Sequence, residues 1–138
     1  MMSSRYAAEV ERLRAALRGT AGRALLRTLG SYLASLPVAA LAADNSSHYV
    51  AANALAEELT GYSVAELATL TVRDLTPVGN TDDGTSLWKE FISSGEQRGQ
   101  YDLRRRDGSF VRVQYWAYAS IAPGVHLSLL IPETTLPV

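Results

Sequence analysis

Residues 38–77 read VAALAADNSSHYVAANALAEELTGYSVAELATLTVRDLTP, and this stretch decides the fold. Two short apolar runs flank the polar cluster Asp44-Asn45-Ser46-Ser47. Short polar side chains hydrogen-bond their own backbone and tolerate left-handed geometry, so the cluster predicts a tight turn between two strands. The second strand leads into a helix that begins after Asn53.

Each joint after the second strand has its own capping chemistry. Asn53 can cap the first helix by accepting a backbone N–H. Gly61 suits the left-handed position that closes this helix. Ser63 and Glu66 have the spacing of a capping box, in which each side chain covers a free N–H at the start of a helix. A short helical turn over residues 72–75 completes the stretch.

The order of these features resembles the first half of a PAS sensor domain. In that family an opening strand ends in an acidic turn, a second strand runs into an asparagine-led helix, and a GY/S-x-x-E-L motif follows. The matching residues are Asp44, Asn53, Ala54, Glu57, Leu59, Gly61, Tyr62, Ser63, Glu66, Leu67 and Leu75. The resemblance implies an α+β PAS fold, with a five-stranded antiparallel sheet and short helices on one face.

The second half of the chain predicts the rest of this sheet. A short helix over residues 86–94, which carries Trp88, precedes strands over residues 100–106, 109–120 and 125–131. Asp107-Gly108 is a strong hairpin signal, because the turn needs positive φ. The R-R-x-D-G-S run at residues 104–109 matches the usual hairpin of the family, so the resemblance covers about residues 37–133.

Two helices are predicted before the resemblance begins. Residues 4–18 space their apolar side chains by three and four, and a second helix ends at Pro37. Their apolar stripes need burial, so we expect them to cover the outer sheet face within a homodimer. This divides the chain into a helical segment (1–36), a PAS domain (37–133) and a tail (134–138). The side chains expected in the cover and dimer are Val10, Leu13, Leu17, Leu25, Leu29, Trp116 and Tyr118.

Side-chain alternation assigns the two faces of the sheet. Trp116 and Tyr118 face outward, whereas the inner positions are unusually small. Small inner residues either leave room for a mainly apolar ligand or let the helices sit closer with no void. The ligand-binding residues expected for a pocket are Leu41, Ala43, Asn53, Trp88, Leu103, Val113, Tyr115, Ala117, His126 and Ser128.

The sequence argues against several cofactors, and the cofactor stays unknown. The light-sensing and yellow photoreceptor branches of the family use a reactive cysteine for flavin and a thiol-linked chromophore, and this chain has no cysteine. Haem-binding members usually take their axial histidine from the region equivalent to residues 70–95, which holds none here, so haem through His126 is disfavoured. His48 should be exposed, and two lone histidines do not make a metal site.

The charge is unevenly spread. Residues 1–36 carry six arginines against Glu9 and Glu11, a net charge of +4, and the rest carries −5. Such a basic face is either solvated or touches RNA, anionic lipid or an acidic partner. No aromatic residues interleave with the arginines, so we expect no nucleic acid. The apolar runs are too short to span a bilayer and the opening residues do not resemble a signal peptide, which predicts a cytoplasmic protein without membrane contact.

Three functions follow as alternatives. The first is a homodimeric sensory module that binds a small, mostly apolar molecule and signals through the N-terminal helices to a downstream partner. The second is a ligand-free PAS-fold module for dimerisation or partner docking. The third is a small enzyme on a cone-like α+β fold, with Tyr115 and His126 as acid/base groups. The sequence contains no catalytic motif, so we expect no enzyme.

Overall fold

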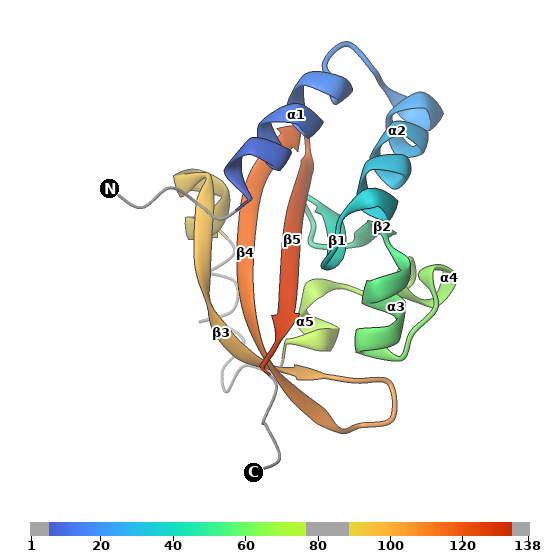
Figure 1. Ribbon diagram of the computed structural model, residues 1–138, viewed down its shortest axis with the longest axis vertical. Coiled ribbons are helices and arrows are strands. Elements are labelled where there is room, and N and C mark those ends of the chain that lie inside the picture. Colours follow the sequence, from blue (N-terminus) through green and yellow to red (C-terminus); the bar gives the residue numbers. More distant parts are fainter. Residues whose placement is uncertain (1–5, 77–88, 134–138) are drawn as a thin grey trace.

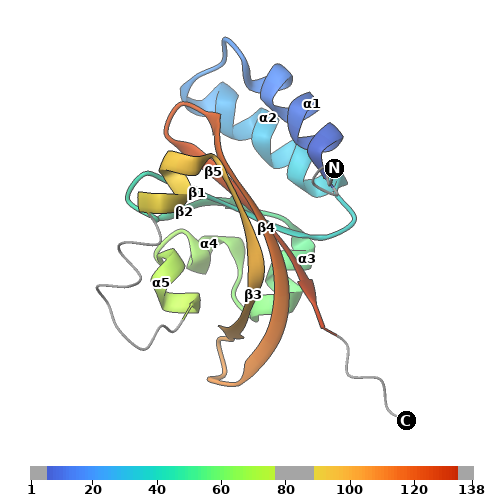
Figure 2. The same cartoon turned by 90° about the vertical axis from the view of Figure 1, so that its left-hand side faces the viewer.

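A five-stranded antiparallel sheet lies between two layers of helices (Figures 1 and 2). The computed structural model describes residues 6–76 and 89–133. The strand order is β2-β1-β5-β4-β3. The strands are β1 (Ala39–Asp44), β2 (Tyr49–Ala52), β3 (Glu96–Arg104), β4 (Phe110–Ala122) and β5 (Val125–Pro132). The helices are α1 (Ala7–Leu17), α2 (Gly22–Ser35), α3 (Ala54–Thr60), α4 (Val64–Leu67) and α5 (Val72–Leu75). Residues 89–94 are also helical.

The N-terminal helices cover the outer face of the sheet, as predicted. Val10, Leu13 and Leu17 of α1 are buried, together with Leu29 and Leu33 of α2. They form one core with the outward side chains of β4 and β5, in which Leu25 and Trp116 are partly buried and Tyr118 is buried. The ring of Tyr6 meets that of Trp116 edge-on, with centroids 5.5 Å apart. The spacing of apolar residues along the sequence was therefore sufficient to predict that these helices cover the sheet.

The turn after β1 is confirmed in its predicted form. One carboxylate oxygen of Asp44 accepts from the backbone N–H of Ser46 at 2.9 Å and from that of His48 at 3.0 Å. Ser47 takes the left-handed conformation with φ 66°. His48 is exposed, as expected.

The predicted caps of the short helices are also confirmed. Gly61 ends α3 with φ 80°, in the left-handed region. Ser63 accepts from the N–H of Glu66 at 3.1 Å, and Glu66 accepts from the N–H of Ser63 at 2.9 Å. This reciprocal capping box starts α4. A carboxylate oxygen of Asp74 accepts from the N–H of Thr71 at 2.8 Å, at the start of α5.

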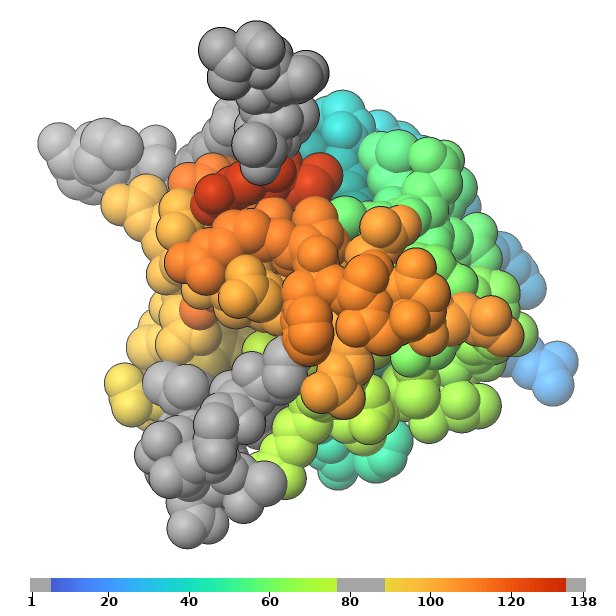
Figure 3. Space-filling view, turned by 90° about the horizontal axis from the view of Figure 1, so that it is seen from below, coloured from blue at the N-terminus to red at the C-terminus, as the bar shows by residue number. Residues whose placement is uncertain are grey.

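The β3–β4 hairpin turns at Gly108, which has φ 88°. Its tip lies against the short helices, and Figure 3 shows this end of the hairpin beside them. The Arg106 N–H donates to the carbonyl of Thr60 at 2.8 Å, and the Arg106 side chain pairs with Glu66 at 3.0 Å. The hairpin therefore reaches across the sheet and holds α3 and α4 in place.

Two strands are longer than the sequence indicated. β3 begins at Glu96 instead of residue 100, because it pairs with β4 continuously from Glu96 opposite Tyr118 to Arg104 opposite Phe110. Its opening residues are polar, so they carry no strand signal of their own. β4 continues to Ala122 through an irregular step after Tyr118. None of the described helices has the length and apolarity that crossing a membrane requires.

The inner face of the sheet is closely packed at one end. Leu103, Val113 and Leu130 are buried there against Leu67 of α4 and Leu75 of α5. Towards the other end, the inward side chains of β1, β5 and β4 become small. The sheet is therefore filled beneath α4 and open beside the first turn. The predicted tail (134–138) and Trp88 lie outside the described residues, and the predicted domain boundaries stay predictions.

Candidate functional site: a pocket on the inner face of the sheet

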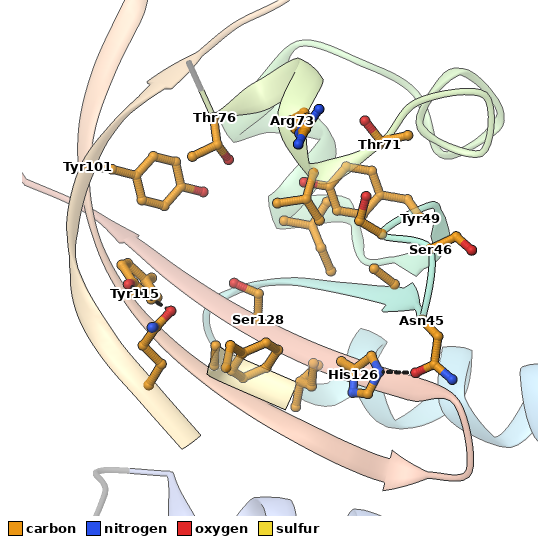
Figure 4. A pocket seen from close by; sticks show the side chains of 18 of the residues that line it. Asn45, Ser46, Tyr49, Thr71, Arg73, Thr76, Tyr101, Tyr115, His126 and Ser128 are labelled. Carbon is orange, nitrogen blue, oxygen red and sulfur yellow. Dashed lines mark hydrogen bonds between the residues drawn. The ribbon is translucent and has the colours of Figure 1, made fainter. Parts of the chain in front are cut away.

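A pocket of about 620 Å³ lies where the inner face becomes open (Figure 4). Small-molecule sites in proteins have volumes of this order. The inner faces of β1, β5, β4 and β3 form one wall. The turn after β1 and the residues of α5 form the other, and Phe91 from the helical residues 89–94 adds an aromatic side chain.

The sheet wall is one row of side chains in register. Leu41 pairs with Ser128, Ser128 pairs with Ala117, and Ala117 pairs with Gln97. All four residues line the pocket. Since the two central members are a serine and an alanine, the sheet leaves a hollow at the middle of the row.

A tyrosine cluster forms one end of the pocket. The rings of Tyr101 and Tyr115 meet edge-on at 5.5 Å, and the Tyr115 hydroxyl is 3.2 Å from the side-chain oxygen of Gln97. Gly99 permits this arrangement, because a Cβ at Gly99 would lie 3.2 Å from the Tyr115 ring. Tyr101 faces Thr76 across this end (Figure 4). Burial raises the pKa of Tyr101 to about 12, so its hydroxyl stays protonated at neutral pH.

His126 and Asn45 form the other end (Figure 4). Nδ1 of His126 accepts the backbone N–H of Ser120 at 2.9 Å. A backbone N–H can only donate, so Nε2 carries the proton and donates to the Asn45 side-chain oxygen at 2.7 Å. Burial lowers the pKa of His126, and the Asp44 carboxylate opposes that shift. His126 is thus a neutral imidazole with both ring nitrogens engaged.

The wall opposite the sheet adds hydroxyl groups and one cation. Thr71, Arg73 and Thr76 line the pocket from this wall, and Tyr49 lines it from β2. Burial raises the pKa of Tyr49 well above its ordinary value, so this hydroxyl is also neutral. No carboxylate occurs among the described residues that line the pocket. The site can therefore hold an apolar body and hydrogen-bond its ends, with no acidic group among those residues to balance a cationic ligand.

The site does not resemble an acid/base pair. Tyr115 and His126 line the same pocket, as the enzyme alternative requires. However, Nδ1 of His126 is occupied by a structural backbone bond, and burial raises the pKa of Tyr115. A proton transfer through His126 would therefore have to break a bond that shapes β4.

Six of the ten predicted pocket residues line this pocket: Leu41, Ala43, Tyr115, Ala117, His126 and Ser128. Leu103 and Val113 point to the same face but lie in the packed core, because the short helices fill that end of the sheet. Trp88 is outside the described residues. Asn53 does not line the pocket, and its place is structural.

Asn53 joins three elements through its side chain. Its oxygen accepts from Ala56 and Ala40, both at 3.0 Å, and its nitrogen donates to Leu33 and Val38, both at 2.8 Å. The side chain therefore caps α3 as predicted and also fixes the end of α2 to β1. Sequence reasoning found the first role, since a cap is local, and missed the second, since Leu33 and Ala40 are distant in the chain.

Several lining residues were not predicted from the sequence, among them Asn45, Tyr49, Phe91, Gln97 and Tyr101. A signal existed for the two in β3. Extending the pairing from the Asp107-Gly108 turn places Tyr101 opposite Val113 and Gln97 opposite Ala117, on the inner face. Asn45 and Tyr49 belong to the first turn and its following strand, and only the tertiary fold brings Asn45 to His126 of β5 and Tyr49 into the same pocket.

Comparison with known proteins gives structural neighbours only. No family model and no curated protein matches the chain. It is similar to the PAS domain of a protein from Colwellia psychrerythraea (18% identity, TM-score 0.67, covering 81% of this chain and 99% of that one). It is also similar to the LOV protein of Rhodobacter sphaeroides (14%, 0.68, 84% and 71%).

A third neighbour is a domain of a sensory box sensor histidine kinase/response regulator from Geobacter sulfurreducens (20%, 0.62, 81% and 98%). The five-stranded antiparallel sheet with its helices, described above, is the arrangement that matches the PAS fold of these neighbours. At these identities the likeness concerns the fold. The chain has the PAS fold.

Proposed function

We propose that the protein is a sensory module that binds a small, mostly apolar molecule in the inner pocket and passes its occupancy to α1 and α2. The observation that carries this proposal is the shared sheet. Ala117 lines the pocket, and the next residue, Tyr118, is buried under the N-terminal helices. A change on one face of β4 therefore acts one residue away from the other layer. Neighbours of the same fold include PAS domains of sensor histidine kinases.

The pocket favours a ligand with an apolar body and polar ends. Leu41, Ala43 and Val72 supply aliphatic contacts along its length, and Phe91 supplies an aromatic face. The hydroxyl groups of Tyr101 and Tyr115 lie at one end and the His126–Asn45 pair lies at the other. An organic cation is disfavoured, because a buried charge needs a partner of opposite sign and the described lining supplies no carboxylate.

The proposal is tested by identifying what the pocket binds. Mass spectrometry of the denatured extract would detect a retained molecule, and thermal unfolding across a metabolite panel would detect a lost one. A ligand present at 100 times its Kd stabilises the fold by about 2.7 kcal/mol. For a domain of this size that is a rise in Tm of roughly 5–10 °C. An empty extract with no shift across the panel would contradict ligand binding.

A matched pair of variants links any binding to this pocket. Ala117→Leu places three extra carbons on the sheet wall and should abolish the thermal shift. Ala54→Leu makes the same change at an exposed position of α3 and should leave the shift intact. Equal shifts in the two variants would place the ligand elsewhere.

The homodimer is a separate part of the proposal. The apolar stripes of α1 and α2 pack against the sheet of their own protomer. The surface we propose for contact with a second copy is the outward side of α2, where Leu26 is 45% exposed. Leu26→Glu should halve the mass measured by light scattering. Leu55→Glu, on the exposed side of α3, is the matched control and should not. A wild-type protein with the mass of one chain would exclude the homodimer.

A further inference from the structure

The irregular step in β4 is a short backbone segment that is bonded to α1 on one side and, through His126, to the pocket on the other. Tyr118 pairs with Leu127 and Ala122 pairs with Val125, so three residues of β4 stand opposite His126 alone. This is a β-bulge, and Ser120 at its centre has φ 55°. Bulges bend a strand and re-aim its side chains. Here Ala119 faces Phe91, and Ile121 enters the core under the N-terminal helices.

His126 holds the centre of the bulge from the pocket side. The Ser120 N–H, which the bulge removes from the regular pairing, donates to Nδ1 of His126 at 2.9 Å. The other ring nitrogen bonds Asn45, and the ring lies edge-on to Phe91 with centroids 5.9 Å apart. All three side chains line the pocket. The orientation of one imidazole ring therefore depends on groups that a ligand would contact.

Arg14 holds the same bulge from the other side. Its guanidinium donates to the Ala119 carbonyl at 3.1 Å and also pairs with Glu11 on α1. The Ala119 N–H donates to the Gly95 carbonyl at 2.8 Å, next to the helical residues 89–94 that carry Phe91. Consecutive backbone groups of the bulge are thus bonded to α1 through Arg14 and to the pocket through His126.

We propose that His126 is the positioning residue that transmits occupancy of the pocket to α1, through the bulge at Ser120 and the contact of Arg14 with Ala119. This inference rests on the proposed function only for the ligand that would fill the pocket. The path from His126 to α1 consists of contacts within the protein itself. A molecule that displaces Asn45 or Phe91 turns the imidazole ring. This rotation of the ring breaks the hydrogen bond between Nδ1 and the Ser120 N–H. The bulge then relaxes, and the Ala119 carbonyl moves away from Arg14.

Two substitutions of His126 distinguish the effect of its hydrogen bond to Ser120 from the effect of the packing of its ring. In His126→Asn the side-chain oxygen stands near the position of Nδ1 and still accepts from Ser120. In His126→Gln the polar end stands near Nε2, so the bond to Asn45 is kept and the acceptor for Ser120 is lost. Hydrogen exchange of the Ser120 amide and of the α1 amides reports both ends of the proposed path.

The expected result is faster exchange of α1 in His126→Gln and unchanged exchange in His126→Asn. The increase should be about fivefold, the factor that follows from losing one ordinary hydrogen bond. Equal behaviour of the two variants would overturn the proposal, because ring packing and not the acceptor would then matter. Faster exchange at Ser120 without any change in α1 would overturn it too.

A double-mutant cycle tests the second step. Arg14→Ala should raise exchange in α1, and adding His126→Gln to it should have no further effect, because both changes break one path. Arg12→Ala, which removes an exposed arginine of the same helix, should combine additively with His126→Gln. Additive effects for Arg14 would refute the path.

One measurement needs no variant. Nitrogen chemical shifts of the wild-type protein at pH 7.5 should show His126 neutral, with its proton on Nε2. A proton on Nδ1 would refute the proposal even if His126→Gln failed to fold. These experiments use ligand-free protein, so they test the coupling independently of any ligand. An empty extract with no thermal shift across the metabolite panel would contradict the proposed sensory function and leave the coupling standing.

Discussion

Replacing Asn53 by aspartate gives the sharpest test of how the helices are attached to the sheet. As a simple N-cap, asparagine is equivalent to aspartate, and alanine costs about 1 kcal/mol. The structure predicts a different order of stability for the alanine and aspartate variants of Asn53. The side-chain nitrogen of Asn53 donates to the carbonyls of Leu33 and Val38 at 2.8 Å. Aspartate would place a carboxylate oxygen against both carbonyl oxygens in a buried site.

The magnitudes follow from the bonds that each variant loses. Asn53→Ala removes four hydrogen bonds, but Ala56 N–H and the Leu33 carbonyl keep a second backbone partner. At about 1 kcal/mol for each bond, the four losses sum to about 4 kcal/mol, and the two groups that keep a partner lower the expected loss in the free energy of unfolding to about 2–4 kcal/mol. Asn53→Asp keeps both accepted bonds and adds an uncompensated buried charge, which costs about 3–5 kcal/mol. We therefore expect aspartate to be at least as destabilising as alanine.

Urea unfolding followed by circular dichroism measures these differences. Ser63 is the matched control, because it caps α4 at an exposed position. Ser63→Asp should be nearly neutral and Ser63→Ala should cost about 1 kcal/mol. If Asn53→Asp stays within about 0.5 kcal/mol of the wild type, the two donated bonds do not contribute and the reasoning is refuted.

Three further predictions concern two glycines and the dependence of stability on pH. Gly99→Ala should displace the Tyr115 ring, which a Cβ would approach to 3.2 Å, and lower the free energy of unfolding by about 1 kcal/mol in urea titrations. Gly61→Ala forces φ 80° on a residue with a Cβ and should cost about 1–2 kcal/mol by the same assay.

The third concerns pH. Burial lowers the pKa of His126, so the unfolded chain binds the proton more tightly. Stability should fall as pH drops through about 6.5, and His126→Asn should flatten the profile of Tm between pH 7.5 and 5.5.

Local chemistry explains why the sequence predicted the first half of the chain well. The Asp44 turn, the Gly61 stop and the Ser63–Glu66 box each involve residues within four positions of one another. Such features need no knowledge of the fold. Alternation along β4 was equally informative, and it placed Ala117 inward and Trp116 and Tyr118 outward, as observed.

The candidate site was harder to predict, because its residues come from segments that meet only in the folded chain. Asn45 and His126 are 81 positions apart, and Arg14 and Ala119 are 105 apart. The bulge at Ser120 has no signal in the sequence, since serine is not a residue that favours positive φ and the partner of its N–H, the His126 ring, belongs to another strand. Leu103 and Val113 show a second limit of prediction from the sequence. Alternation gave their face correctly, but only the position of α4 and α5 decides which part of that face is filled.

The alternation along β4 also has a practical consequence for engineering the protein. Positions 113, 115 and 117 face the short helices and the pocket, and positions 116 and 118 face α1 and α2. A codon library at positions 115 and 117 would vary the lining of the pocket, and one at 116 and 118 would vary the packing of the sheet under the N-terminal helices. The two libraries lie within four consecutive codons, so the pocket lining and the packing against the N-terminal helices can be varied separately on a single strand.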